Sequence, residues 1–228
     1  MDPFTLTAGA AAVSAGAVAT MVRRASLARA RDRAAIFDEI APLFDQPLLT
    51  QEPDGFARLG GRLNGQRFDL RVMQDTLTMR KLPALWLLVT LAEPQPLAAT
   101  TDILLRPSGA EPFSPFMRLP ATVTPPPGLP ADAGLRSDGM GALPDPAILA
   151  PHLPILHEAP AKELLMTPAG LRIVWLTEEA DRTRYLLYRD AELGRQPLPA
   201  ALARRLTSAL SALAADLAEG VADRRKSA

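Results

Sequence analysis

The sequence predicts an α+β fold, in which a long N-terminal helix and a C-terminal amphipathic helix accompany an antiparallel sheet built from hairpins. Three patterns predict it: a charge-free apolar run near the N-terminus, period-two alternation around Asn64-Gly65, and a stripe of leucines near the C-terminus. The 228 residues are 48% hydrophobic and 22% charged, which is the composition of a folded domain rather than of a disordered chain.

These patterns divide the chain into four parts. We expect a membrane-anchor helix at 1–22, an amphipathic juxtamembrane helix at 23–47, an α+β domain at 55–218 and a basic tail at 219–228. The domain contains a Pro-rich connecting stretch at 107–160. The proline density there excludes long helices and central strands, so we expect a surface loop with short ordered pieces.

The N-terminal run carries no charge from Phe4 to Val22, a length near the lower limit for an α-helix that crosses a bilayer. Arginines follow the run, whereas a cleavable signal peptide has its positive charges before the apolar segment. This order predicts a retained anchor with the domain facing the cytoplasm, at the inner membrane if the protein is bacterial. The strongly apolar anchor residues are Phe4, Leu6, Val13, Val18, Met21 and Val22.

Small residues recur at every fourth position of this run and would let a second helix approach closely in lipid. They form a helix-packing face of Ala8, Ala12, Gly16 and Thr20. The face predicts a protein partner or a homo-oligomer. An alternative is a soluble protein that oligomerises through the same helix.

The helical pattern continues beyond the arginines, because Ile36, Phe37, Ile40, Leu43 and Phe44 recur at the spacing of an amphipathic stripe. Prolines at 42 and 47 end it. At the other end of the chain, a final helix presents one continuous stripe made of Leu198, Leu202, Leu206, Leu210, Leu213 and Leu217.

Between the helices, the strand signals are short alternating or apolar segments. Alternation on both sides of Asn64-Gly65 predicts a hairpin with a type I′ turn. With strands at 82–91 and 101–106, it makes an antiparallel sheet of about four strands. Strands at 163–166, 171–176 and 184–189 then form a second small sheet or extend the first.

The charged and polar residues exclude several function classes. Basic and acidic residues balance at 25 each, so the chain lacks the positive field of a nucleic-acid-binding protein. There is no cysteine, and no nucleophile elbow, phosphate loop or metal-ligand spacing occurs, so we expect neither a metal nor a cofactor. The candidates for an anion or ligand site are Arg172, Arg182, Arg184, His152 and His157.

The absence of a catalytic set, together with the N-terminal run, predicts a non-catalytic, membrane-tethered protein. Its cytoplasmic α+β domain would bind a protein partner. The alternative is an enzyme, or a domain that binds a small ligand or anion, with a site around the late arginines and the two histidines.

Overall fold

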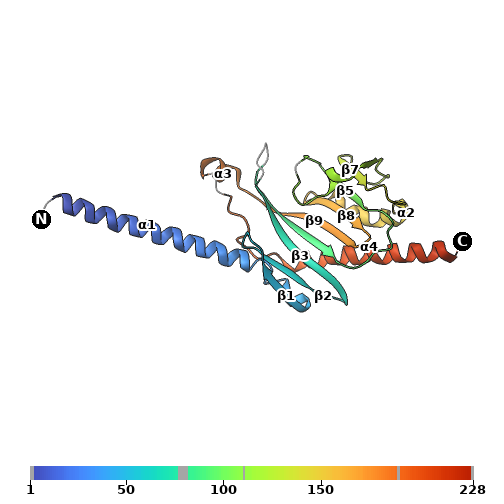
Figure 1. The fold of residues 1–228 in the computed structure, drawn as a ribbon, viewed down its shortest axis with the longest axis horizontal. Helices are drawn as coiled ribbons and strands as arrows, with labels where there is room; N and C mark the ends of the chain where they lie inside the picture. The colour runs from blue at the N-terminus through green and yellow to red at the C-terminus, as the bar shows by residue number, and fades with distance from the viewer. Residues whose placement is uncertain (1–2, 77–81, 110, 189–190, 227–228) are drawn as a thin grey trace.

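The computed structural model describes residues 3–76, 82–109, 111–188 and 191–226, which contain one antiparallel sheet of nine strands (Figure 1). Neighbouring strands follow the order β1-β2-β3-β4-β9-β8-β5-β7-β6, so β4 and β9 join the two halves of the sheet. The strands are β1 (Asp45–Gln51), β2 (Ala57–Leu63), β3 (Gln66–Asp75), β4 (Ala84–Leu91), β5 (Thr101–Leu105), β6 (Ala121–Val123), β7 (Ala133–Ser137), β8 (Ala161–Thr167) and β9 (Gly170–Glu179).

The helices are two long ones at the ends of the chain and several short ones between them. The α+β class is confirmed, because the long C-terminal helix packs on the sheet and the long N-terminal helix precedes it. The α-helices are α1 (Pro3–Ala34), α2 (Pro146–Leu149), α3 (Arg182–Tyr188) and α4 (Ala200–Lys226), and the 3₁₀ helices are η1 (Ala41–Leu43), η2 (Phe116–Arg118) and η3 (Ala150–His157).

The core lies between the sheet and α4. The leucine stripe faces the sheet, and Leu206 and Leu210 are fully buried. On the sheet, Leu59, Leu70 and Leu87 are fully buried as well. Helix α4 continues through Lys226, so the predicted tail at 219–228 is helical as far as that residue.

Helix α1 projects away from this body (Figure 1). Residues 15–31 are exposed throughout, and contact with the body begins near its C-terminal end. There Arg33 donates a hydrogen bond to the carbonyl of Asp54 at 2.7 Å and lies over the ring of Phe56. Within the described ranges, none of the helices combines the length and the apolar character that a bilayer crossing needs.

The predicted helix at 23–47 is wrong beyond Ala34. The chain turns there, passes through η1 and enters β1 at Asp45. The apolar residues of the predicted stripe are buried all the same, because the turn lays Ile36, Phe37 and Ile40 on the core. The backbone N–H of Leu198 then donates to the carbonyl of Ile36 at 2.9 Å, a contact that a continuing helix would prevent.

Strands β2 and β3 pair antiparallel and meet at Asn64-Gly65. Asn64 has φ 52° and Gly65 has φ 79°, as a type I′ turn requires. The turn fixes the register, with Leu63 opposite Gln66 and Leu59 opposite Leu70.

The late strands extend the first sheet instead of forming a second one. Strands β8 and β9 pair with each other, and β9 pairs with β4. The predicted strand at 184–189 is wrong, because residues 182–188 form α3. The side chain of Asp181 accepts a hydrogen bond from the backbone N–H of Arg184 at 2.7 Å, which caps the helix.

The Pro-rich stretch at 107–160 contains more ordered structure than the sequence predicts. It holds β6, β7, α2 and η3, and β7 lies between β5 and β6. The expectation of no central strand is therefore wrong for residues 133–137. That segment contains no proline, so each of its backbone N–H groups remains available for pairing.

Candidate functional site

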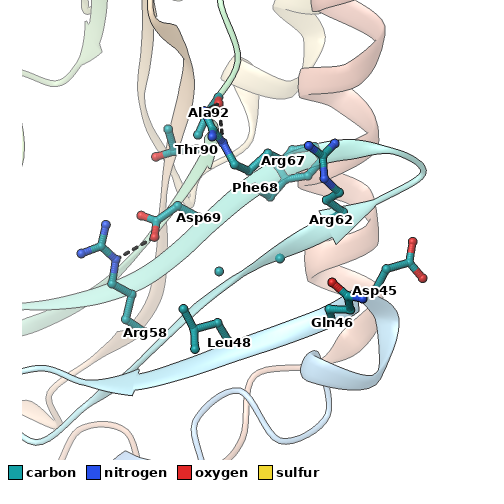
Figure 2. A pocket seen from close by; sticks show the side chains of 12 residues that line it. Asp45, Gln46, Leu48, Arg58, Arg62, Arg67, Phe68, Asp69, Thr90 and Ala92 are labelled. Carbon is teal, nitrogen blue, oxygen red and sulfur yellow. Dashed lines mark hydrogen bonds and ion pairs between the residues drawn. The ribbon is translucent and has the colours of Figure 1, made fainter.

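The outer face of the sheet, which is the face opposite α4, is covered only in part. Segment 111–119 covers β5, β8, β9 and part of β4, with Phe113 packed against Leu88 and Val174. Nothing in the described residues covers the other half in this way. A groove of about 820 Å³ opens there (Figure 2), lined by Asp45, Gln46, Leu48, Arg58, Gly60, Gly61, Arg62, Arg67, Phe68, Asp69, Thr90 and Ala92.

Alternation in the β2–β3 hairpin determines which side chains reach the groove. Leu59, Phe68 and Leu70 point into the core, so the residues between them point outward. Where the two strands pair with each other, at 58–63 and 66–71, the outward residues are Arg58, Gly60, Arg62, Arg67, Asp69 and Arg71.

The register places arginines directly opposite one another. Arg62 faces Arg67, and Arg58 faces Arg71 across the hairpin. Like charges at directly opposite positions repel each other and destabilise a sheet unless another charge compensates them. Asp69, which is opposite Gly60, lies between the two pairs, whereas Asp75, the other acidic residue on the outward side of β3, lies at the far end of that strand.

Arg58 is the compensated member of this set. Its Nε lies 2.6 Å from Oδ1 of Asp69, and its Nη1 lies 3.5 Å from Oε1 of Glu52. The hydrogen bond and the charge of Asp69 raise the pKa of Arg58 further above its ordinary value. Asp69, the aspartate between the two arginine pairs, is therefore already engaged.

The other three arginines have no carboxylate partner among the described residues. Arg62 donates to the carbonyl of Gly65 at 2.6 Å, and Arg67 donates to the carbonyl of Ala92 at 2.9 Å. Arg71 is half-buried on the same face. Carbonyls orient a guanidinium but leave its charge uncompensated, so this face can bind carboxylates or phosphates.

The floor of the groove is the bare backbone at Gly60. A Cβ atom placed there would meet no heavy atom within 4 Å, so packing in this chain does not require a glycine. At the neighbouring Gly61, a Cβ would lie 3.0 Å from the Cβ of Phe44. Leu48, opposite Gly60 on β1, is 65% exposed and forms an apolar wall of the groove.

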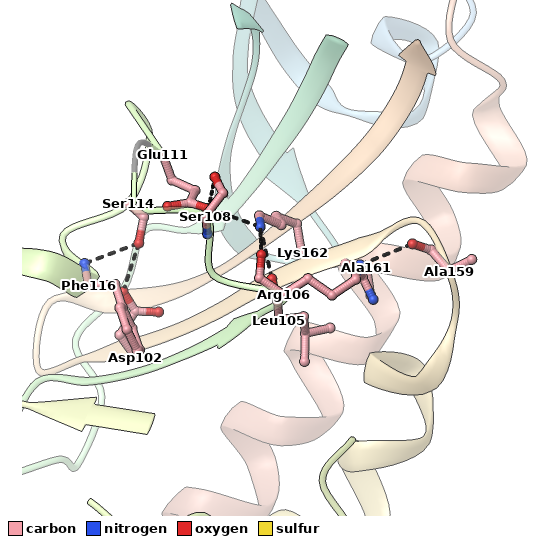
Figure 3. Close-up of polar contacts among 10 residues, drawn as sticks. All are labelled: Asp102, Leu105, Arg106, Ser108, Glu111, Ser114, Phe116, Ala159, Ala161 and Lys162. Atoms are coloured by element: carbon pink, nitrogen blue, oxygen red, sulfur yellow. Dashed lines mark hydrogen bonds and ion pairs between the residues drawn. The ribbon is translucent and has the colours of Figure 1, made fainter. Parts of the chain in front are cut away.

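A second cluster of polar residues is buried under segment 111–119 (Figure 3). Ser114 donates to Oδ2 of Asp102 at 3.1 Å, and its hydroxyl oxygen accepts from the backbone N–H of Phe116. Lys162 donates to the carbonyls of Leu105 and Arg106 and to Oε1 of Glu111, the last at 3.1 Å. These contacts hold the segment against β5 and β8.

Asp102 and Glu163, on the neighbouring strands β5 and β8, are both fully buried. Burial raises the pKa of Asp102 to about 8, and the negative charge of Glu163 adds to the rise. Burial also raises the pKa of Glu163, against the lowering effect of Arg172, whose Nε and Nη2 lie 3.1 and 2.8 Å from one carboxylate oxygen. At neutral pH the carboxyl of Asp102 therefore keeps its proton.

Glu111 differs from these two carboxyls. Burial alone raises its pKa, but hydrogen bonds from Ser108 and the charge of Lys162 lower it below the ordinary value. Glu111 and Lys162 thus form an ion pair at the edge of the cluster. Because Asp102 and Glu163 have no exposed surface, we assign this cluster to holding segment 111–119 in place rather than to binding a substrate.

The five residues predicted from the sequence as an anion or ligand site have different partners, and no hydrogen bond or ion pair among the described residues joins any two of them. Arg172 belongs to the buried cluster. Arg184 pairs with Glu192 at 2.6 Å, and Arg182 is exposed on α3. His157 donates to the carbonyl of Gly128 at 2.8 Å.

His152 is the candidate with the most enclosed surroundings. Its Nε2 lies 2.8 Å from Oδ2 of Asp216, beside a small cavity of about 200 Å³ between η3 and α4. Apart from His152, the lining is apolar: Pro151, Ile155, Leu164, Ile173, Ala209, Leu210 and Leu213. The described residues also contain no group of histidines and carboxylates suited to a metal ion.

Sequence reasoning missed the arginines of the groove, although the signal was present. The alternation that assigns Leu59 and Leu63 to one face assigns Arg58 and Arg62 to the other. Comparison with family models, curated proteins and solved structures gives no significant match. The groove is therefore interpreted from its own geometry.

Proposed function

We propose that the chain is a non-catalytic, membrane-tethered protein whose α+β domain binds a protein partner. The observation that carries the proposal is the exposure of α1, where Val18, Met21 and Val22 are 60%, 70% and 61% exposed. Apolar side chains that no other part of the chain buries are more stable in contact with a bilayer or with another helix than in water. The arginines after the run favour a cytoplasmic body, at the inner membrane if the protein is bacterial.

Helix α3 supports the tether independently. Leu186, Leu187 and Tyr188 are 56%, 70% and 72% exposed, with Arg182 and Arg184 one turn earlier. Apolar side chains beside arginines are typical of a surface that rests on an anionic leaflet. Figure 1 places α3 on the side of the body from which α1 projects.

The composition of α1 favours a tether that includes a second helix. Its face of Ala8, Ala12, Gly16 and Thr20 would allow close approach, whether by a partner protein or by a second copy of this chain. The hydroxyl of Thr20 donates to the carbonyl of Gly16 at 2.8 Å, so it enters such an interface already hydrogen-bonded.

Cell fractionation tests the tether. We expect the full-length protein in the membrane fraction, from which it is released only by detergent or by carbonate treatment. Recovery in the soluble fraction without either treatment contradicts the proposal.

The exposed small-residue helix also supports a second candidate, a soluble protein that oligomerises through α1. This candidate predicts that removal of residues 1–22 changes the size of the assembly but not the recovery with membranes. Analytical ultracentrifugation and fractionation of the same two proteins distinguish the candidates.

A further inference from the structure

Among the described residues, the arginines on the groove face of β2 and β3 outnumber the carboxylates that pair with their side chains. Arg62 and Arg67 are directly opposite each other, and within the described part of the chain their side chains hydrogen-bond only to backbone carbonyls. Arg71 adds a third guanidinium on the same face. The two acidic residues of the lining are Asp69, which is engaged by Arg58, and Asp45 at the rim.

Repulsion between opposite arginines is relieved when an anionic group lies between them. A carboxylate offers one guanidinium two oxygens and a negative charge, whereas the Ala92 carbonyl offers Nε and Nη2 of Arg67 a single neutral oxygen. The groove also has an apolar part, formed by Leu48 and the bare backbone at Gly60. An occupant that matches both parts has carboxylates and an apolar side chain close together.

We infer that this groove binds an acidic, extended segment of a partner protein. Carboxylates of the segment pair with Arg62 and Arg67, and an apolar side chain lies over Gly60 against Leu48. The inference rests on the partner-binding part of the proposed function and names the chemistry of the partner. It does not depend on how α1 is held.

Two other anionic occupants fit the groove less well. Figure 1 places the β2–β3 turn, beside which Arg62 and Arg67 lie, on the side of the body away from the N-terminal end of α1, so a bilayer that holds α1 is distant from them. Single-stranded nucleic acid needs exposed rings on which bases stack. Phe68, the aromatic residue of the described lining, is 1% exposed.

The test uses the purified full-length chain in detergent and a fluorescein-labelled peptide of alternating glutamate and valine. Matched peptides carry glutamine or lysine in place of glutamate, and binding is followed by fluorescence anisotropy at low salt. We expect the glutamate peptide to bind about tenfold or more tightly than either matched peptide, as charge-assisted pairing predicts.

Variants locate the binding. The double substitution Arg62→Gln with Arg67→Gln is expected to weaken binding of the glutamate peptide about tenfold. Arg118→Gln with Arg204→Gln removes the same charge from exposed positions outside the groove and is expected to change the affinity less than about twofold. Gly60→Leu, which fills the floor, is expected to weaken binding while circular dichroism stays that of the native chain.

Three results overturn the inference: equal affinity for the glutamate and glutamine peptides, equal losses in the groove and control variants, or glutamate-peptide binding that Gly60→Leu leaves intact. Tighter binding to phosphatidylglycerol vesicles or to an oligonucleotide, lost in the groove variant, also overturns it in favour of another anion. If only the membrane tether is wrong, the full-length protein is soluble and still binds the glutamate peptide, so the two failures can be told apart.

Discussion

At the scale of single residues, the buried carboxyl pair makes folding sensitive to pH. Burial raises the pKa of Asp102 from 3.8 to about 8, so the folded state keeps a proton that the unfolded chain releases at neutral pH. The free energy of unfolding therefore falls as the pH rises from about 4 to about 8, because the folded state binds more protons throughout that window. Above about pH 8 the folded state also releases this proton, and the stability that protonated Asp102 contributes is lost.

The substitution Asp102→Asn tests this assignment. The carboxamide has nearly the shape of the protonated carboxyl, can accept from Ser114 and does not ionise. We expect a weaker fall in stability between pH 5 and pH 9, measured by urea unfolding, so that the variant equals or exceeds the original protein at the upper end. Asp132→Asn, at an exposed position, is the control. Identical pH profiles for the original protein and Asp102→Asn would mean that Asp102 is ionised in the fold at neutral pH.

Two neighbouring glycines provide a second prediction at this scale. A Cβ at Gly60 meets nothing within 4 Å, whereas a Cβ at Gly61 lies 3.0 Å from the Cβ of Phe44. Gly60→Ala is expected to leave stability unchanged or raise it by about 0.5 kcal/mol. Gly61→Ala is expected to lower it by about 1–3 kcal/mol, because Phe44 must move. Chemical denaturation measures both changes in the free energy of unfolding. If Gly60→Ala lowers it as much as Gly61→Ala does, the side chain at position 60 is restricted by packing after all.

At the scale of elements, the sequence predicts what depends on near neighbours. The β2–β3 hairpin is encoded by alternation and by Asn64-Gly65, and the helical leucine stripe by its own spacing. The end of α1 is not encoded in this way. The stripe of Ile36, Phe37 and Ile40 suits a helix and an irregular turn equally, and only contact with the core decides between them.

Two other elements show the same limit. Strand β1 is exposed along its whole length and has no buried alternation, so its pairing with β2 is what makes it a strand. The α3 segment is short and mixes arginines with apolar residues, which fits either class of structure. The local signal that identifies the helix is the cap provided by Asp181.

Helix α3 provides the prediction that belongs to this scale. Replacing Leu186, Leu187 and Tyr188 with serine is expected to leave stability nearly unchanged, because these side chains are 56%, 70% and 72% exposed. The same change is expected to reduce co-sedimentation with vesicles that contain phosphatidylglycerol, since it removes the apolar part of the contact.

Met117→Ser with Met140→Ser is the matched control, at exposed positions 58% and 80% accessible elsewhere on the body. Vesicles of phosphatidylcholine alone separate the contribution of charge from that of apolar contact. If the α3 variant and the control lose vesicle co-sedimentation equally, α3 is not part of the surface that contacts the membrane.

At the scale of the whole molecule, both polar sites depend on pairings that sequence patterns do not reveal. Asp102 and Glu163 meet because β5 pairs with β8 across the Pro-rich stretch. The groove requires β1 and β4 beside the hairpin, and it stays open because segment 111–119 covers only the other half of the sheet. Alternation alone would have identified Arg58, Arg62, Arg67 and Arg71 as one face, but not the cavity beside them.

The separation of α1 from the body leads to the last prediction. Residues 15–31 are exposed, and contacts with the body begin near Arg33, so removal of residues 1–22 is expected to change the free energy of unfolding by less than about 0.5 kcal/mol. Urea unfolding measures this, and the glutamate peptide should still bind the shortened chain. A fall in stability that depends on protein concentration would instead show that α1 is buried between copies, because only an oligomer links unfolding to concentration. An unchanged unfolding curve together with loss from the membrane fraction would leave the bilayer as the environment that α1 occupies.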